Sequence, residues 1–111
     1  MGKKIRTYSS RTSQALHLLG SLIKAARKRK EWSESELAER CGTTRTTVRK
    51  IEQGNPGTEI GLYFETANLL GIPLLADDSD ELSAIQKRTD LELSVLPKRI
   101  RKGSGEVFDD F

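Results

Sequence analysis

The sequence predicts an all-α fold made of short helices that carry their own start and stop signals. Only 5% of the residues are aromatic while 32% are charged, which fits a small helical domain better than a β-sandwich. Apolar residues recur at spacings of three and four, and Ser, Thr or Asp precedes most of these runs. With 111 residues, the chain is long enough for one domain with a modest core and terminal extensions.

The first helix is expected at about residues 14–30, capped by Ser13 and preceded by a flexible basic arm at residues 1–12. The sequence RKRK at 27–30 places four cations at its C-terminal end, where the helix dipole favours positive charge. Trp32 follows as an apolar residue between the first and second helices. The residues expected to face the core are Leu16, Leu19, Leu22, Ile23 and Ala26.

The second helix has the clearest start signal in the chain. Ser33 and Glu36 have the spacing of a capping box, so this helix should begin at Glu34. Gly42 should end it. Ala38 offers the small side chain that two closely crossing helices need at their contact.

A third short helix follows after a tight turn. Thr44 is a good N-cap because its hydroxyl can accept from an unpaired backbone amide, and Gly54 suits the left-handed position beyond the last turn. Two short capped helices joined around Gly42 and Thr43 predict a helix-turn-helix. The domain that contains it is expected to span residues 13–75.

Two more helices are expected beyond it. NPGT at 55–58 predicts a turn, and Thr58 is expected to cap a fourth helix at about 59–70. The stripe that should face the core there is Ile60, Phe64 and Ala67. Asp78 and Glu81 have capping spacing and predict a fifth helix.

The segment at residues 76–97 is expected to form this C-terminal helix and to mediate dimerisation. LELSV at 91–95 alternates like a strand but could also continue the helix, and Pro97 ends it in either case. Residues 98–111 are expected to be a flexible tail.

The third helix has one apolar and one polar side. Val48 and Ile51 should point inward, which leaves a basic outer face. Taken alone, such a face is most often a solvated surface, but its place in a helix-turn-helix favours contact with DNA. The expected base contacts are Arg45, Thr46, Arg49 and Lys50, and the expected phosphate contacts are Ser33, Thr43, Thr44, Gln53 and Asn55.

The charges are segregated along the chain. Residues 1–30 contain nine basic residues and no acidic one, whereas the remaining residues contain ten basic and sixteen acidic ones. The net charge is +3. A basic front on an acidic body predicts an oriented surface for a polyanion such as nucleic acid.

Enzymatic chemistry is not expected. The single histidine, His17, and the single cysteine, Cys41, cannot supply the ligand set of a zinc site, and no acid, base and nucleophile converge. We therefore expect no catalysis, no metal and no cofactor. One cysteine also fits a reducing compartment, and no apolar run predicts a membrane span or a secretory signal. A soluble cytoplasmic protein is expected.

The stretch LGSLIKAARKRKEWSESELAERCGTTRTTVRKIEQG resembles the DNA-binding domain of Xre-type repressors, the lambda repressor and Cro group. The resemblance rests on an arginine in the first helix, on S-x-x-E-L-A-x-x-x-G and on T-V-x-x-I-E-x-G. It implies a five-helix domain whose third helix enters the major groove. It also implies an ion pair between Arg27 and Glu52.

A narrower resemblance covers NPGTEIGLYFETANLLGIPLL, LPKRIRK and the acidic ending VFDDF, which together look like antitoxins of the HipB type. It implies a homodimer that represses its own operon and binds a HipA-like kinase toxin. Two alternatives remain: a stand-alone Xre-type repressor of a phage or mobile element, and an interaction protein that no longer binds DNA.

A dimer on a palindromic operator is also expected because one helix-turn-helix buries little DNA surface. The candidate dimer contacts are Leu74, Leu75, Leu82, Ile85 and Val95. The tail sequence GEVFDDF could be a disordered end or a partner-binding motif anchored by Phe108 and Phe111.

Overall fold

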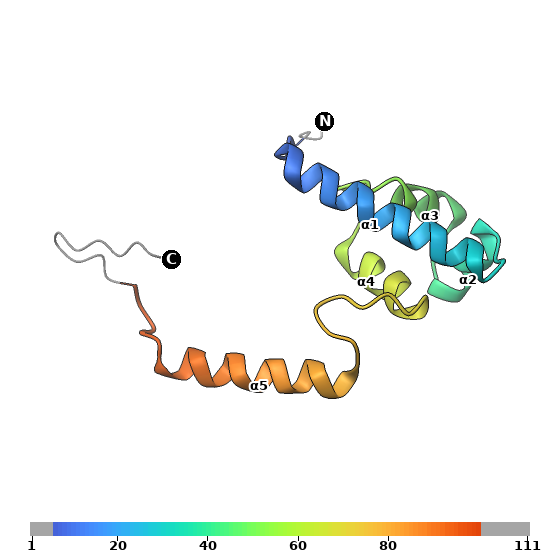
Figure 1. The fold of residues 1–111 in the computed structure, drawn as a ribbon. Coiled ribbons are helices and arrows are strands. Elements are labelled where there is room, and N and C mark those ends of the chain that lie inside the picture. The colour runs from blue at the N-terminus through green and yellow to red at the C-terminus, as the bar shows by residue number, and fades with distance from the viewer. Residues whose placement is uncertain (1–5, 101–111) are drawn as a thin grey trace. The chain divides into compact units, whose positions relative to one another are not determined.

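The computed structural model describes residues 6–100, and over them it contains five helices and no β-strand (Figure 1). The helices are α1 (Ser10–Arg29), α2 (Glu34–Cys41), α3 (Arg45–Glu52), α4 (Ile60–Leu69) and α5 (Ser79–Val95). The first four belong to a compact unit that ends at Leu74, and α5 belongs to a second unit. The predicted all-α fold is confirmed.

The core of the first unit lies beneath α3. This helix packs against α1 and α2, and α2 also packs against α4. Burying one such aliphatic side chain contributes about 1.5–3 kcal/mol, so the inner side of α3 is firmly attached. The buried core residues are Ile23, Ala26, Leu37, Ala38, Val48, Ile51, Tyr63, Ala67 and Leu70.

The expected ends of α2 and α3 are confirmed. Ser33 Oγ accepts from the Glu36 amide at 3.0 Å, and the Ser33 amide donates to Glu36 Oε1 at 2.8 Å. Thr44 Oγ1 accepts from the Thr47 amide at 3.2 Å. Gly42 and Gly54 have left-handed φ angles of 70° and 73°.

The start of α1 differs from the expectation. The helix begins at Ser10, and its cap is Ser9, whose Oγ accepts from the Thr12 amide at 3.3 Å. Ser13 lies inside the helix, because nothing between Ser9 and Ser13 interrupts helical backbone. Leu22, which was expected to face the core, is 46% exposed. It lies at the edge of the apolar face of α1 that contains the buried Ile23 and Ala26.

The expected cap and core face of α4 are wrong. Thr58 does not cap the helix, and its hydroxyl oxygen is buried without a hydrogen-bond partner. Ile60 is 71% and Phe64 41% exposed, although Ala67 is buried as expected. The core face instead contains Tyr63, Thr66, Ala67 and Leu70.

Hydrogen bonding explains why polar residues of α4 face inward. The Tyr63 hydroxyl donates to the Asn55 carbonyl at 2.7 Å. The Thr66 hydroxyl donates to the Leu62 carbonyl of its own helix, also at 2.7 Å. A hydroxyl that finds a partner can be buried at little cost, so hydropathy alone misplaces this face.

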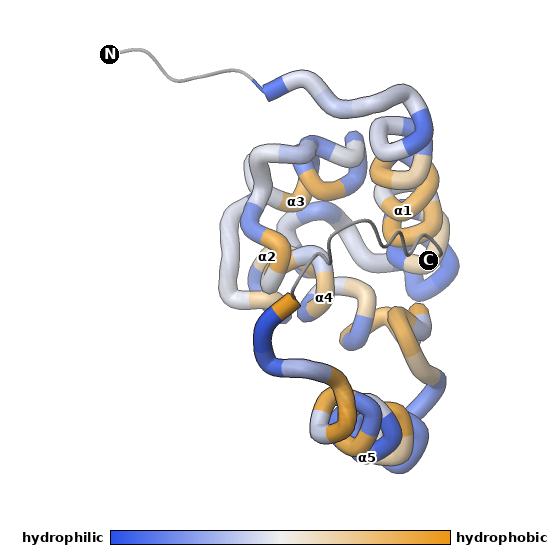
Figure 2. Tube along the Cα trace, turned by 90° about the vertical axis from the view of Figure 1, so that its left-hand side faces the viewer, coloured by the Kyte–Doolittle hydropathy of each residue, from blue (hydrophilic) through white to orange (hydrophobic). Residues whose placement is uncertain are grey.

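The ambiguous segment at residues 91–95 is helical. Asp78 caps α5 by accepting from the Glu81 amide at 2.8 Å. Leu96 has an extended backbone (φ −84°, ψ 150°) immediately before Pro97, as the residue before a proline prefers. Hydrophobic and hydrophilic residues interleave around α5 (Figure 2).

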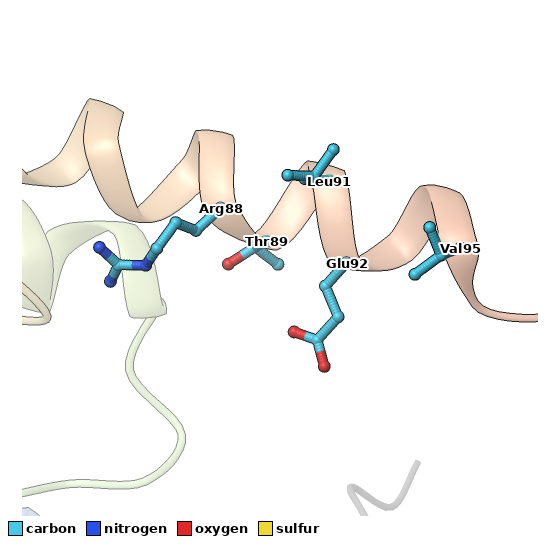
Figure 3. Close-up of a pocket in the computed structure, with 5 residues that line it drawn as sticks. All are labelled: Arg88, Thr89, Leu91, Glu92 and Val95. Carbon is cyan, nitrogen blue, oxygen red and sulfur yellow. The ribbon is translucent and has the colours of Figure 1, made fainter.

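A shallow hollow lies on the surface of α5 alone (Figure 3). Arg88, Thr89, Leu91, Glu92 and Val95 line it. Because one helix supplies all of its walls, it is an open surface and not an enclosed cavity.

Candidate nucleic-acid interface

The outer face of α3 is the candidate reading surface. Val48 and Ile51 are fully buried, which turns the opposite side of the helix outward. The exposed residues there are Arg45, Thr46, Arg49, Lys50 and Gln53. The structure thus brings the four expected base-contacting residues onto one surface.

Two glycines let α1 approach the C-terminal end of α3 closely. A Cβ atom at Gly20 would lie 2.6 Å from the Glu52 carbonyl oxygen and 2.7 Å from that of Ile51. A Cβ atom at Gly54 would lie 2.6 Å from the Leu16 carbonyl oxygen. The two backbones are therefore in direct contact, which fixes the orientation of α3.

A buried ion pair joins the same two helices. Arg27 Nε donates to Glu52 Oε2 at 2.7 Å and Arg27 Nη2 to Glu52 Oε1 at 3.1 Å, while Nη1 donates to the Trp32 carbonyl at 2.8 Å. The hydrogen bond to Glu52 raises the pKa of Arg27, against the effect of burial. The pair implied by the resemblance is present, and it removes the only carboxylate of α3 from the outer face.

A second acidic residue, Glu34, contacts the reading surface from the start of α2. Its Oε1 accepts from Arg45 Nε and from Arg49 Nε, both at 3.0 Å. These two bonds, first that of Arg45 and then that of Arg49, lower the pKa of Glu34.

Sequence reasoning missed this role. It treated Glu34 only as the first residue of a helix. Glu34 lies 11 and 15 residues from the two arginines, so a local pattern cannot show the contact. The sequence feature that could have indicated this contact is an acidic residue at the first position of the first helix of a helix-turn-helix.

The candidate phosphate contacts lie around α2 and α3 at the helix ends. Ser33 and Thr44 are the N-caps of α2 and α3, and both are exposed. The Thr44 hydroxyl also donates to Thr47 Oγ1 at 3.1 Å. Thr43 lies in the turn, where its amide donates to the Ala38 carbonyl at 2.9 Å.

The remaining two candidates follow α3. Gln53 is the exposed C-cap residue of the helix. Asn55 is held on both sides: its Oδ1 accepts from the Gly57 amide at 2.7 Å, and its carbonyl accepts from Tyr63. Both bonds use oxygen atoms, so the side-chain amide nitrogen remains available to donate to a phosphate.

The residues that could carry other chemistry are dispersed. His17 is exposed on α1, and Cys41 Sγ lies 3.5 Å from Thr66 Oγ1. Between residues 6 and 100 no group of three or more His, Cys, Asp or Glu residues could hold a metal ion. No helix in this part of the chain combines the length and apolarity that crossing a bilayer requires.

Comparison with known proteins identifies a helix-turn-helix in this chain. Residues 23–75 match the family model described as helix-turn-helix. The match begins within α1, covers α2, α3 and α4, and ends just beyond the first compact unit. Among curated proteins, none matches the chain significantly.

Proposed function

We propose that this chain, whose residues 23–75 form a lambda-repressor-like helix-turn-helix domain, is a sequence-specific DNA-binding repressor. One observation carries the proposal: α3 and its C-cap residue Gln53 expose three cations and two hydrogen-bonding side chains on one face, while Val48 and Ile51 on the other face are buried in the core. In this arrangement α3 can enter the major groove as a rigid body.

Arg45 is the proposed principal base contact. It begins α3, the end of a recognition helix that meets base edges. A guanidinium can donate two hydrogen bonds to one guanine, a contact worth about 1–3 kcal/mol of discrimination. Thr46, Arg49 and Lys50 are proposed to read neighbouring positions.

Selection from randomised duplexes tests the proposal. The wild-type chain should enrich one palindromic sequence, and Arg45→Ala should relax the preference at one position in each half-site. Lys87→Ala removes the same charge from α5 and should leave the preference intact. If Arg45→Ala weakened binding equally on selected and shuffled duplexes, Arg45 would be a phosphate contact instead.

We further propose that the repressor acts as a homodimer through α5. Leu82, Ile85, Thr89 and Leu93 repeat at spacings of three and four along one side of the helix, and Leu96 follows as its C-cap residue. Leu82 is 46%, Leu93 60% and Leu96 49% exposed. Of the other residues expected at the contact, Val95 lies on the opposite side of α5, whereas Leu74 and Leu75 precede the helix.

The finer proposal is that the chain is the antitoxin of a HipA-like kinase toxin and represses its own operon. Its support is the resemblance of residues 55–75, 96–102 and the acidic ending to antitoxins of the HipB type. The ending, with Phe108 and Phe111, lies outside the residues that the structure describes. The alternative is a stand-alone Xre-type repressor of a phage or mobile element.

The adjacent gene separates these two roles. For the antitoxin, it should encode a kinase-like protein that co-purifies with this chain when the two are expressed together. Truncation after Lys102 should then weaken the complex while leaving operator binding nearly intact. A neighbouring gene without a kinase sequence would favour the stand-alone repressor.

A further inference from the structure

The position of Glu34 is unusual for a surface that binds a polyanion. It is the first residue of α2, next to the N-cap Ser33, where a helix N-terminus ordinarily favours a phosphate. A carboxylate at this point repels the DNA backbone unless other groups neutralise it. Arg45 and Arg49 supply that neutralisation, because both donate to the same oxygen of Glu34 at 3.0 Å.

The atoms used in these contacts determine what each arginine can still bind. Both bonds use Nε, so the outer edge of each guanidinium, with Nη1 and Nη2, remains available. That edge can donate two parallel hydrogen bonds, the pattern that guanine O6 and N7 accept. One carboxylate therefore holds two guanidinium groups through Nε, in hydrogen bonds that use neither Nη1 nor Nη2 of either arginine.

The network contributes little to the stability of the fold. The side chains of Arg45 and Arg49 are 57% and 54% exposed, and exposed ion pairs of this kind contribute little to folding. Holding two long side chains in one conformation does, however, reduce the entropy that they lose on meeting DNA. The benefit of the network thus lies in binding.

Resting on the proposed DNA-binding function, we propose that Glu34 is a specificity-determining residue that positions Arg45 and Arg49 to read guanines and keeps them off phosphates. The three side chains act as one reading unit with a net charge of +1. Without the carboxylate, both arginines become free cations that can bind any phosphate within reach.

Three variants test this proposal on the duplex that the wild-type chain selects and on a shuffled duplex of equal composition. Glu34→Gln removes the charge, and Glu34→Asp keeps the charge but shortens the reach to the arginines. Glu39→Gln is the matched control, because it removes one exposed carboxylate from the same helix. Thermal melting of each variant accompanies the binding measurement.

For Glu34→Gln we expect the ratio of affinities for selected and shuffled duplexes to fall about tenfold. Binding to the shuffled duplex should tighten and depend more steeply on salt, since each of the two freed arginines can add about one phosphate contact. Glu34→Asp should also lower the ratio. Because it keeps the negative charge, it should not tighten binding to the shuffled duplex. Glu39→Gln should retain the wild-type ratio, and all three melting temperatures should remain close to that of the wild type.

A Glu34→Gln variant that binds both duplexes more tightly by the same factor would overturn the proposal, because Glu34 would then only screen charge. An unchanged ratio in Glu34→Asp would likewise show that carboxylate position is irrelevant. If the wild-type chain itself made no distinction between duplexes, the DNA-reading function would fail together with this inference. The behaviour of the wild-type chain therefore separates the two failures.

Discussion

At the scale of single residues, Gly20 and Gly61 are two helical glycines in opposite environments. A Cβ at Gly20 would meet the backbone carbonyls of α3 at 2.6 and 2.7 Å, whereas one at Gly61 would have no atom within 4 Å. The same substitution should therefore have opposite effects at the two positions. One glycine is required by packing, and the other only lowers helix propensity.

Gly20→Ala should lower the free energy of unfolding by about 1–3 kcal/mol, because backbone atoms of α1 or α3 must move to admit the methyl group. Gly61→Ala should raise it, by up to about 1 kcal/mol, since alanine favours helix. Urea denaturation measures the free energy of unfolding of both variants. A neutral Gly20→Ala would show that α1 and α3 can separate without cost.

The pair of Arg27 and Glu52 should behave as a unit. Replacing either residue alone, by Arg27→Met or Glu52→Leu, strands a buried charge and should cost about 3–5 kcal/mol. The double replacement leaves no unpaired charge and should cost clearly less than the sum. Urea denaturation of the wild type, the two single variants and the double variant gives the coupling energy. If the two single losses in free energy of unfolding simply added up in the double variant, the residues would not act as a coupled pair.

At the scale of helices, local signals predicted the starts of α2, α3 and α5 but not those of α1 and α4, whose expected caps Ser13 and Thr58 are wrong. The caps at Ser33, Thr44 and Asp78 depend on residues three positions apart, so sequence alone identifies them. The face of α4 depends on Tyr63 finding the Asn55 carbonyl, a contact that no period of hydrophobic residues reveals. The hydrogen bonds between Glu34 and the two arginines could not be predicted for the same reason.

The end of α1 contains an unfavourable backbone position. Glu31 has a left-handed φ of 59°, and the following Trp32 amide donates to the Arg27 carbonyl at 3.2 Å, the bond that closes a Schellman motif. A glycine normally occupies this position, as Gly42 and Gly54 do at the ends of α2 and α3.

Glu31→Gly should stabilise the protein by about 1 kcal/mol, because it relieves the steric cost that a side chain has in the left-handed region. Ser35→Gly is the control: it places glycine inside α2 and should destabilise by about 0.5–1 kcal/mol. Thermal unfolding followed by circular dichroism compares the two. A loss of stability in Glu31→Gly would mean that the Glu31 side chain makes a contribution of its own.

At the scale of the whole molecule, the proposed dimer depends on one side of α5. Leu82→Asp combined with Leu93→Asp should produce a monomer by light scattering at micromolar concentration and weaken binding to the palindrome. Leu91→Asp, on the opposite side of the helix, should remain dimeric. A wild-type monomer that binds the operator one to one would contradict the proposal.

The basic residues that precede α1 offer a second test of the whole molecule. Because Ser9 caps α1, the deletion that leaves the helix intact removes residues 2–8 and with them Lys3, Lys4 and Arg6. We expect weaker DNA binding and a shallower dependence on salt, as each lost phosphate contact lowers the slope by about one. An unchanged slope would exclude these residues from the interface.

Because α3 has one buried side and one exposed side, its exposed residues can be exchanged without changing the core, both in engineering and in evolution. Exchanging the residues at 45, 46, 49, 50 and 53 should retarget the protein to another operator without disturbing Val48 or Ile51. Such exchanges are not independent under the proposed role of Glu34, however. Replacing Arg45 alone leaves Arg49 as the sole partner of Glu34, so new specificities should arise most readily when positions 34, 45 and 49 change as a trio.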